Sequence, residues 1–150
     1  MKTLIQRVSR ASVWVDGVLV GAIDRGLLLF VGVEKGDTEA DADATARKIQ
    51  RLRVFPGRTP MDETLEDVGG GCLVVSQFTL AGSLKKGNRP GFDKAEDPAI
   101  AERLYLRVAE QLAAVGLPVA TGSFGAMMDV QLTNDGPVTF LLEVQAGKVL

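Results

Sequence analysis

The feature that most constrains the fold is a continuous apolar run from Leu27 to Val33, in the order Leu-Leu-Leu-Phe-Val-Gly-Val. A short run without a polar side chain, preceded by the turn residues Asp24-Arg25-Gly26, is typical of a strand that is covered on both faces. A second strand of this buried kind is predicted from Cys72 to Phe78. The chain therefore needs a sheet whose inner strands are shielded on both sides.

Other segments predict strands near both ends of the chain. In the N-terminal third, strand-like residues flank Asp16-Gly17, which is a strong signal for a two-residue hairpin turn. Near the C-terminus, two strand-like runs flank the segment Asn134–Thr139. The strands predicted in these two regions are 3–8, 12–15, 18–23, 119–123, 128–133 and 138–144.

Two segments have helical periodicity. From Thr38 to Arg53, apolar residues recur on one face, acidic residues fill the first turns and basic residues fill the last, as suits the helix dipole. A second helix is expected to start with Asp97 as N-cap and Pro98 at the first position, and to end at Gly116.

The order of these elements is strands, helix, strand, helix, strands. It predicts an α+β fold in which mostly antiparallel sheets form a barrel-like pair of β layers covered by two helices. The length of 150 residues indicates a single domain over residues 1–150, and we expect the tail 145–150 to be frayed and flexible.

Histidine is absent, and Cys72 is the only cysteine. The lack of histidine excludes Ser-His and Cys-His nucleophilic mechanisms as well as histidine-ligated zinc. One cysteine cannot form an intrachain disulfide, and we expect Cys72 to be a structural thiol in the core. The sequence predicts no metal and no cofactor, so a hydrolytic site here has to handle the proton without imidazole.

The net charge of −2 argues against a protein that coats long stretches of nucleic acid, and no DNA partner is expected. Lys85, Lys86 and Arg89 share one glycine-rich loop, which is either a site for a few phosphate contacts or a solvated loop. The first seven residues lack the apolar region of a signal peptide, and no apolar run approaches the ~20 residues that span a bilayer. These features predict a cytoplasmic protein with no membrane partner.

Two motifs are candidates for a functional site. In Asn134–Thr139, a cis Gly136-Pro137 peptide would direct two consecutive carbonyls toward an ammonium group, but the same composition is also typical of an ordinary hairpin loop. In Ser76–Thr79, backbone amides at a strand end are suited to stabilise an oxyanion. The alternative is that Ser76 and Thr79 only satisfy local backbone groups, and Thr79 is a poor nucleophile because no histidine activates it.

Together, Ser76-Gln77-Phe78-Thr79-Leu80 and Asn134-Asp135-Gly136-Pro137-Val138-Thr139 resemble the signature motifs of the D-aminoacyl-tRNA deacylases, which are dimeric proofreading enzymes. The similarity covers about residues 1 to 144. It departs from the family at Gly91, where serine is common, and in the tail. Supporting matches are Gln6-Arg7-Val8, Ala11-Ser12-Val13, Gly32-Val33, Asn88-Arg89-Pro90, Phe92, Phe124-Gly125-Ala126, Met128 and Val130.

This resemblance implies hydrolysis of the ester of D-aminoacyl-tRNA, and of glycyl-tRNA, with rejection of L-aminoacyl substrates. It implies a homodimer that binds the aminoacylated tRNA acceptor end and inserts Gly136-Pro137 into the partner's active site. The catalytic segment is Ser76, Gln77, Phe78 and Thr79, acting chiefly through its backbone and aided by the 2′-hydroxyl of the tRNA. The substrate-binding residues are Gly136, Pro137, Arg7, Met128 and Asn134, with Arg7 bracing the partner's Gly136-Pro137 loop.

Two alternatives remain from the sequence. One is an editing hydrolase for another mischarged aminoacyl-tRNA. The other is a noncatalytic dimeric RNA-binding module in which Gly136-Pro137 is only a turn; a broader basic surface would be its expected sign, and the chain lacks one.

Overall fold

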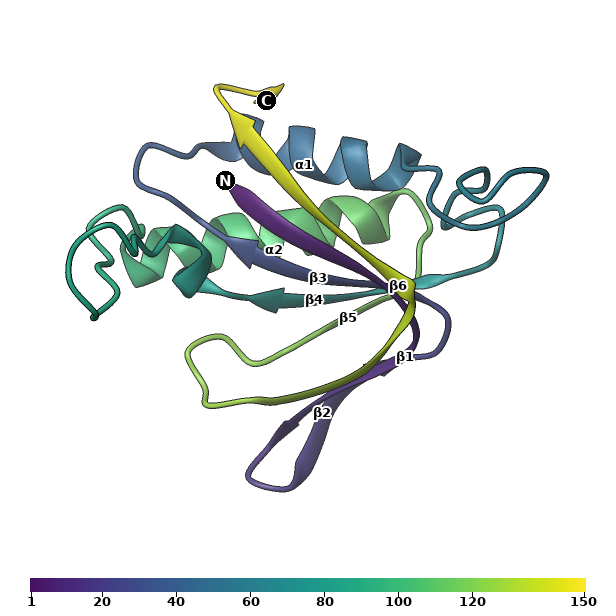
Figure 1. Ribbon diagram of the computed structural model, residues 1–150, viewed down its shortest axis with the longest axis horizontal. Helices are drawn as coiled ribbons and strands as arrows, with labels where there is room; N and C mark the ends of the chain where they lie inside the picture. Colours follow the sequence, from purple (N-terminus) through teal and green to yellow (C-terminus); the bar gives the residue numbers. More distant parts are fainter.

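A computed structural model describes residues 1–150 as one curled seven-stranded sheet with two helices on one face (Figure 1). The strand order is β5-β4-β3-β1-β6-β7, and β2 also pairs with β1. The predicted fold class is confirmed, although the β layers are parts of one curled sheet. Neither helix has the length and apolar character needed to pass through a membrane.

The N-terminal part of the sheet is built on the long strand β1, Lys2–Val15. The prediction of two separate strands here was wrong because β1 continues through both and changes its neighbour: its first half pairs with β3, Gly26–Gly32, and its second half with β2, Val18–Ile23. The predicted turn between β1 and β2 is confirmed, with Asp16 and Gly17 at φ values of 48° and 77°.

The two helices connect parallel strands. Helix α1, Glu39–Arg51, links β3 to β4, Gly71–Ser76, and helix α2, Pro98–Ala114, links β4 to β5, Val119–Thr121. The β3–β4 and β4–β5 pairs are therefore parallel, whereas the pairs made by β1 and β6 are antiparallel. Pro98 occupies the start of α2 as predicted.

The C-terminal part of the chain differs from the prediction. One strand, β6, runs from Asp129 to Gln145 in place of two strands joined by a hairpin turn. Both halves of β6 pair with successive parts of β1, so they do not pair with each other. The tail is also not frayed in the structure: β7, Lys148–Val149, folds back on β6, and the amide of Gly147 donates to Asp41 Oδ1 at 2.8 Å.

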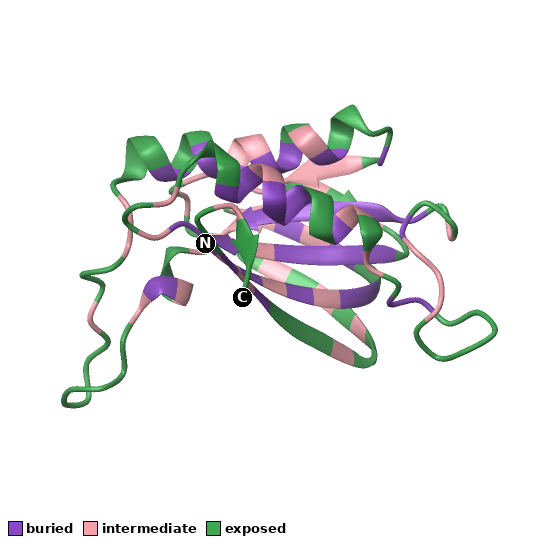
Figure 2. Cartoon of the chain, turned by 90° about the horizontal axis from the view of Figure 1, so that it is seen from above, coloured by how far each residue is buried: buried purple, intermediate pink, exposed green.

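The core has two parts on opposite faces of the inner strands, which are buried along most of their length (Figure 2). The larger part lies between the sheet and the helices and includes Leu27, Leu29 and Cys72, whereas Leu28 and Leu73 point into the curl. The prediction that the 27–33 run is covered on both faces is confirmed. Cys72 is a buried core thiol as expected, and burial raises its pKa to about 12.

Candidate active site

A cavity of about 590 Å³ lies where β4 ends and α2 begins. Three segments separated in sequence form most of its wall: Ser76–Thr79 after β4, Ala95–Pro98 at the start of α2, and Phe124–Met128 between β5 and β6. Ten of its sixteen lining residues are hydrophobic. All four predicted catalytic residues, and Met128 from the predicted substrate-binding set, line this cavity.

The Ser76–Thr79 segment turns sharply at the end of the sheet. The amide of Gln77 donates to the carbonyl of Val31 at 2.8 Å, which ends the β3–β4 ladder, and the 3-10 turn η1, Phe78–Ala81, follows. The first amides of a helical turn have no acceptor inside that turn. Phe78 and Thr79 occupy these positions, so their amides can serve an oxyanion, whereas the Gln77 amide is already used.

The hydroxyl of Thr79 accepts a hydrogen bond from the side-chain amide of Gln77. Thr79 is exposed, and no cationic or basic group contacts its hydroxyl. A hydroxyl without an adjacent base is a weak nucleophile. This geometry favours a role for Thr79 through its backbone.

Gly32, the last residue of β3, fixes how closely the turn approaches the sheet. A Cβ built on Gly32 would lie 2.8 Å from Leu80 Cβ and 2.9 Å from the carbonyl oxygen of Gln77. Both distances are shorter than an ordinary van der Waals contact, and neither atom is the far end of a flexible side chain. Only glycine therefore allows the Gln77–Leu80 backbone to rest on β3 in its present position.

Aromatic side chains support the cavity wall. Phe124 stacks on Tyr105 of α2 with ring centroids 6.0 Å apart, and the Tyr105 hydroxyl donates to the carbonyl of Val74 at 3.3 Å. Burial raises the pKa of Tyr105, so this phenol stays neutral as a structural group. At the cavity mouth, Phe78 packs edge-on against Phe92 with centroids 5.1 Å apart, and both rings are exposed.

Glu96 was missed by sequence reasoning and is the only ionisable side chain in the cavity wall. Its Oε1 accepts a hydrogen bond from the amide of Asp97 at 2.8 Å, and its own amide donates to the carbonyl of Val33 at 3.1 Å. Its place just before the predicted N-cap was the one local signal that it lies at the start of α2. One carboxylate oxygen is thus committed to the helix start.

The Asn134–Thr139 motif forms a bulge within β6. Val8 pairs with Asn134 and Gln6 pairs with Thr139, so the four residues 135–138 stand opposite Arg7 alone. Extra residues of this kind bend a strand and direct its backbone outward. The Gly136-Pro137 peptide is cis, Gly136 has a φ of 134°, and both residues are exposed. The hairpin-loop alternative is therefore wrong.

Arg7 holds this bulge from below. It is 8% exposed; its Nη1 donates to the carbonyl of Val54 at 2.7 Å and its Nε to the carbonyl of Asp135 at 3.1 Å. The Asp135 carboxylate adds an ion pair at 3.3 Å. Arg7 is therefore not an ordinary exposed arginine on a strand. Arg7 braces the bulge of its own chain; the sequence expectation assigned this contact to the partner's loop.

Asn134 directs its side chain to the bulge itself. Its Oδ1 accepts from the amide of Val138 at 3.1 Å, and its Nδ2 donates to the Thr139 hydroxyl at 3.0 Å. Gln6 Nε2 donates to the same hydroxyl at 3.2 Å. The polar atoms of Asn134 therefore hold the shape of the bulge, which makes Asn134 a positioning residue in this chain.

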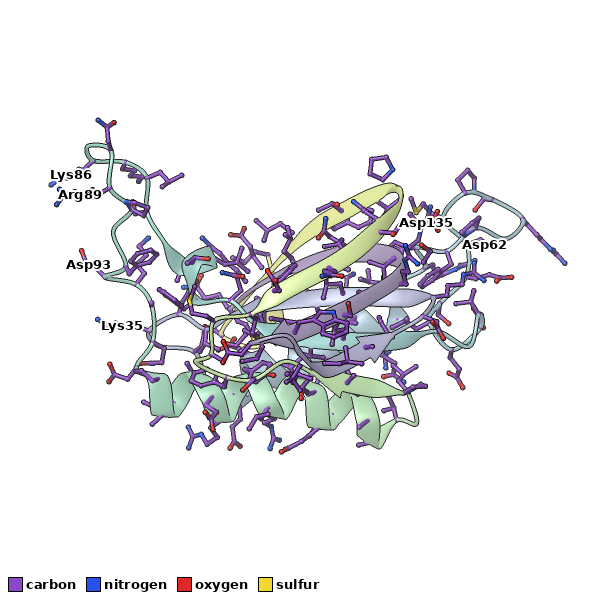
Figure 3. The ribbon with its side chains drawn as sticks, turned by 90° about the horizontal axis from the view of Figure 1, so that it is seen from below. Lys35, Asp62, Lys86, Arg89, Asp93 and Asp135 are labelled. Atoms are coloured by element: carbon purple, nitrogen blue, oxygen red, sulfur yellow. The ribbon has the colours of Figure 1, made fainter.

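The two motifs do not meet within one chain. Gly136, Pro137, Arg7 and Asn134 are all absent from the cavity wall. Figure 3 shows Asp135, at the bulge, toward one end of the molecule, whereas Lys86, in the loop that follows the Ser76–Thr79 segment, lies at the other end. A site that contains both motifs requires a second copy of the chain.

Comparison with known proteins gives consistent matches. The model of the D-Tyr-tRNA(Tyr) deacylase family matches residues 4–143. A D-aminoacyl-tRNA deacylase of Ruegeria pomeroyi is 55% identical over 145 residues, covering 96% of this chain and 100% of that protein. A second, of Geobacter metallireducens, is 54% identical and covers 95% of both chains.

Two solved structures are similar. A c-Myc DNA Unwinding Element Binding Protein aligns with a TM-score of 0.91 at 41% identity, covering 97% of this chain and 100% of the other. A probable eukaryotic D-amino acid tRNA deacylase aligns with a TM-score of 0.78 at 16% identity, covering 93% and 97% of the two chains, and supports the fold alone.

Proposed function

The chain belongs to the D-Tyr-tRNA(Tyr) deacylase family, and we propose that its cavity binds the aminoacyl ester at the 3′ end of D-aminoacyl-tRNA. The protein is a D-aminoacyl-tRNA deacylase, a hydrolase that acts on aminoacyl-tRNA and serves translation quality control. The proposal concerns which residues carry this activity, how D- and L-substrates are distinguished, and where the tRNA lies.

The observation that carries the proposal is that Ser76–Thr79 lines a largely apolar cavity with two amides free to receive an oxyanion. In the proposed reaction, a water molecule attacks the ester carbonyl, and the amides of Phe78 and Thr79 stabilise the negative charge on its oxygen. The 2′-hydroxyl of the terminal ribose helps to activate the water. The bond between the acyl carbon and the 3′-oxygen then breaks, and a proton of the water passes to this oxygen, which gives the free amino acid and tRNA. We assign Glu96, whose Oε1 accepts a hydrogen bond from the amide of Asp97, to holding the start of α2 and give it no part in proton transfer.

Chiral selection is assigned to a second copy of the chain. In a homodimer, Gly136 and Pro137 of one protomer enter the cavity of its partner, and their carbonyls hold the α-ammonium group of the substrate. An L side chain would then collide with this backbone, whereas a D side chain points away from it. The exposure of the bulge and its separation from its own cavity support this arrangement. Glycyl-tRNA has no side chain to reject and is a second substrate.

The main test compares single-turnover hydrolysis of D-tyrosyl-, L-tyrosyl- and glycyl-tRNA. The proposal predicts rapid cleavage of the D- and glycyl-tRNA, for which Met128 and the Ser76–Thr79 segment form the same site, and protection of the L-form. Equal rates for the D- and L-substrates would contradict selection by a backbone wall. Preference for a mischarged L-amino acid would favour the alternative of another editing hydrolase, and tRNA binding without turnover would favour the noncatalytic module.

Mixing two inactive variants tests the exchange between protomers. Ala126→Trp fills the cavity of its own chain, and Pro137→Ala alters the bulge. If each site uses the cavity of one protomer and the bulge of the other, randomly mixed dimers regain about one quarter of the wild-type sites. Sites formed within single chains would regain none, and this result would contradict the homodimeric arrangement.

DNA binding is a second candidate, because one similar structure is of a DNA unwinding element binding protein. The net charge of −2 gives no general electrostatic attraction to a duplex. We expect no saturable binding of duplex DNA in fluorescence anisotropy at physiological salt; tight binding would support this second function. A cytoplasmic location, where charged tRNA is used, remains a prediction.

A further inference from the structure

We propose that the loop Ser83–Gly91, called the basic finger below, binds phosphate groups of the tRNA acceptor stem beside the cavity. This inference rests on the proposed function, since it requires the aminoacyl end of the tRNA to enter the cavity. The finger is exposed from Ser83 to Pro90 and follows the Ser76–Thr79 wall in the chain, and none of its basic residues lines the cavity itself.

The base of the finger is closed by two backbone hydrogen bonds. The amide of Ser83 donates to the carbonyl of Gly91 at 2.7 Å, and the amide of Gly91 donates back to Ser83 at 2.9 Å. Gly87, with a φ of 61°, turns the chain at the tip. The finger is therefore a short hairpin with a fixed base, which reaches about 10 Å beyond that base.

The finger is also attached to the cavity wall. Phe92 follows the finger and packs against Phe78, which lines the cavity. Gly82 precedes the finger and lies under the same ring: a Cβ there would be 3.0 Å from Phe92 Cε1 and 2.9 Å from the carbonyl of Thr79. The position of the finger is thus coupled through contacts of Phe92 and Gly82 to the Phe78–Thr79 amides.

The charges of the finger are unpaired. Lys85, Lys86 and Arg89 are exposed and take part in none of the ion pairs of the structure, and the finger contains no acidic residue. Figure 3 shows Lys86 and Arg89 at its outer end, away from the body of the molecule. A charge of +3 on nine residues contrasts with the net charge of −2 of the whole chain.

The occupant that fits these features is the phosphate backbone of the nucleic acid whose end lies in the cavity. When the 3′ end is bound, the preceding nucleotides leave through the mouth, where the finger begins. Lysine and arginine bind phosphates without reading the bases, so contacts here would serve many tRNAs equally. At most three phosphates are engaged, which predicts a slope of log kcat/KM against log salt no steeper than about −2.7.

The test uses a triple variant, Lys85→Ala/Lys86→Ala/Arg89→Ala, and two substrates, full-length D-tyrosyl-tRNA and the minimal ester D-tyrosyl-adenosine. For wild-type protein, kcat/KM with tRNA falls up to about 40-fold between 50 and 200 mM salt, whereas for the triple variant it is nearly constant. At 50 mM salt the variant is at least about 10-fold slower with tRNA. Both proteins hydrolyse D-tyrosyl-adenosine at the same rate.

The matched control is Arg47→Ala/Lys48→Ala/Arg51→Ala, which removes three exposed basic residues from α1. This control keeps the wild-type rate and salt dependence with both substrates. The inference is overturned, and the proposed function left intact, if the finger variant has the wild-type kcat/KM with D-tyrosyl-tRNA. The same conclusion follows if the control variant loses as much kcat/KM with this substrate as the finger variant does. If wild-type protein hydrolyses neither substrate, the proposed function fails first.

Discussion

Gly32→Ala tests whether the position of the Gln77–Leu80 turn controls deacylation. The added Cβ would lie 2.8 Å from Leu80 Cβ and 2.9 Å from the Gln77 carbonyl oxygen, whereas ordinary contacts begin at 3.4 Å. The turn must therefore move away from β3 by roughly half an ångström, because neither contact is relieved by a side-chain rotation. This shift displaces the amides of Phe78 and Thr79, which directly follow Gln77.

The size of the effect follows from that displacement. A misplacement of about 1 Å in an active site costs about 100-fold in rate, so half of it predicts about a 10-fold loss in the single-turnover rate with D-tyrosyl-tRNA. Overpacking destabilises a core by about 1 to 3 kcal/mol. For a chain of this length, this corresponds to a fall in Tm of about 3 to 10 °C, so the variant stays folded at 25 °C if the wild-type Tm is typical.

The assay is single-turnover deacylation at 25 °C with excess enzyme, together with thermal unfolding followed by circular dichroism. The control is Gly91→Ala, because a Cβ at Gly91 meets only the carbonyl of Ser83 at 4.0 Å; it keeps both the rate and Tm. If Gly32→Ala is destabilised as expected but cleaves D-tyrosyl-tRNA at the wild-type rate, the turn does not hold the oxyanion, and the reasoning is refuted.

Four other changes test separate parts of the description. Thr79→Ala keeps most of its single-turnover activity, because the hydroxyl has no base beside it; near-complete loss with folding intact would identify it as the nucleophile. Glu96→Gln likewise stays within a few-fold of the wild-type rate, and a rate that loses its dependence on pH would reveal Glu96 as a general base. Thr3→Val raises the free energy of unfolding by about 1 kcal/mol, measured in urea, because the buried Thr3 hydroxyl has no hydrogen-bond partner; an unchanged midpoint would contradict this. The hydrogen bond from Arg107 holds the pKa of Asp43 below its usual range, so the pair stabilises the fold above pH ~4, and this contribution is lost as the pH falls through the lowered pKa. Asp43→Asn therefore has a lower Tm than wild type at pH 6 and the same Tm at strongly acidic pH. A difference in Tm that stays constant with pH would exclude this linkage.

The sequence predicted the inner strands and the helix start at Pro98 because their signals are local. A run of apolar residues at 27–33 requires cover on both faces in any arrangement, and Asp97-Pro98 begins a helix whatever surrounds it. The Ser76–Thr79 segment was found for the same reason, since the end of a buried strand coincides with the start of a glycine-rich loop.

The outcome at the C-terminus depended on partners that are distant in the chain. Asn134–Thr139 has the composition of a turn, but its flanking strands both pair with β1, more than 110 residues away, and this pairing produces a bulge in one continuous strand. In the same way, Arg7 is buried because the carbonyls of Val54 and Asp135 accept its hydrogen bonds. Nothing near Arg7 in the sequence encodes these acceptors.

The amino-acid sequence by itself thus determined which segments are apolar, which turn and which contain candidate site groups. Only the tertiary structure decided that Glu96 joins the cavity wall, that Gly32 lets the Gln77–Leu80 turn lie close against β3, and that the bulge lies away from its own cavity. The physical reason is that patterns along a chain record the surroundings each side chain needs, whereas the pairing of distant strands selects which residues provide them.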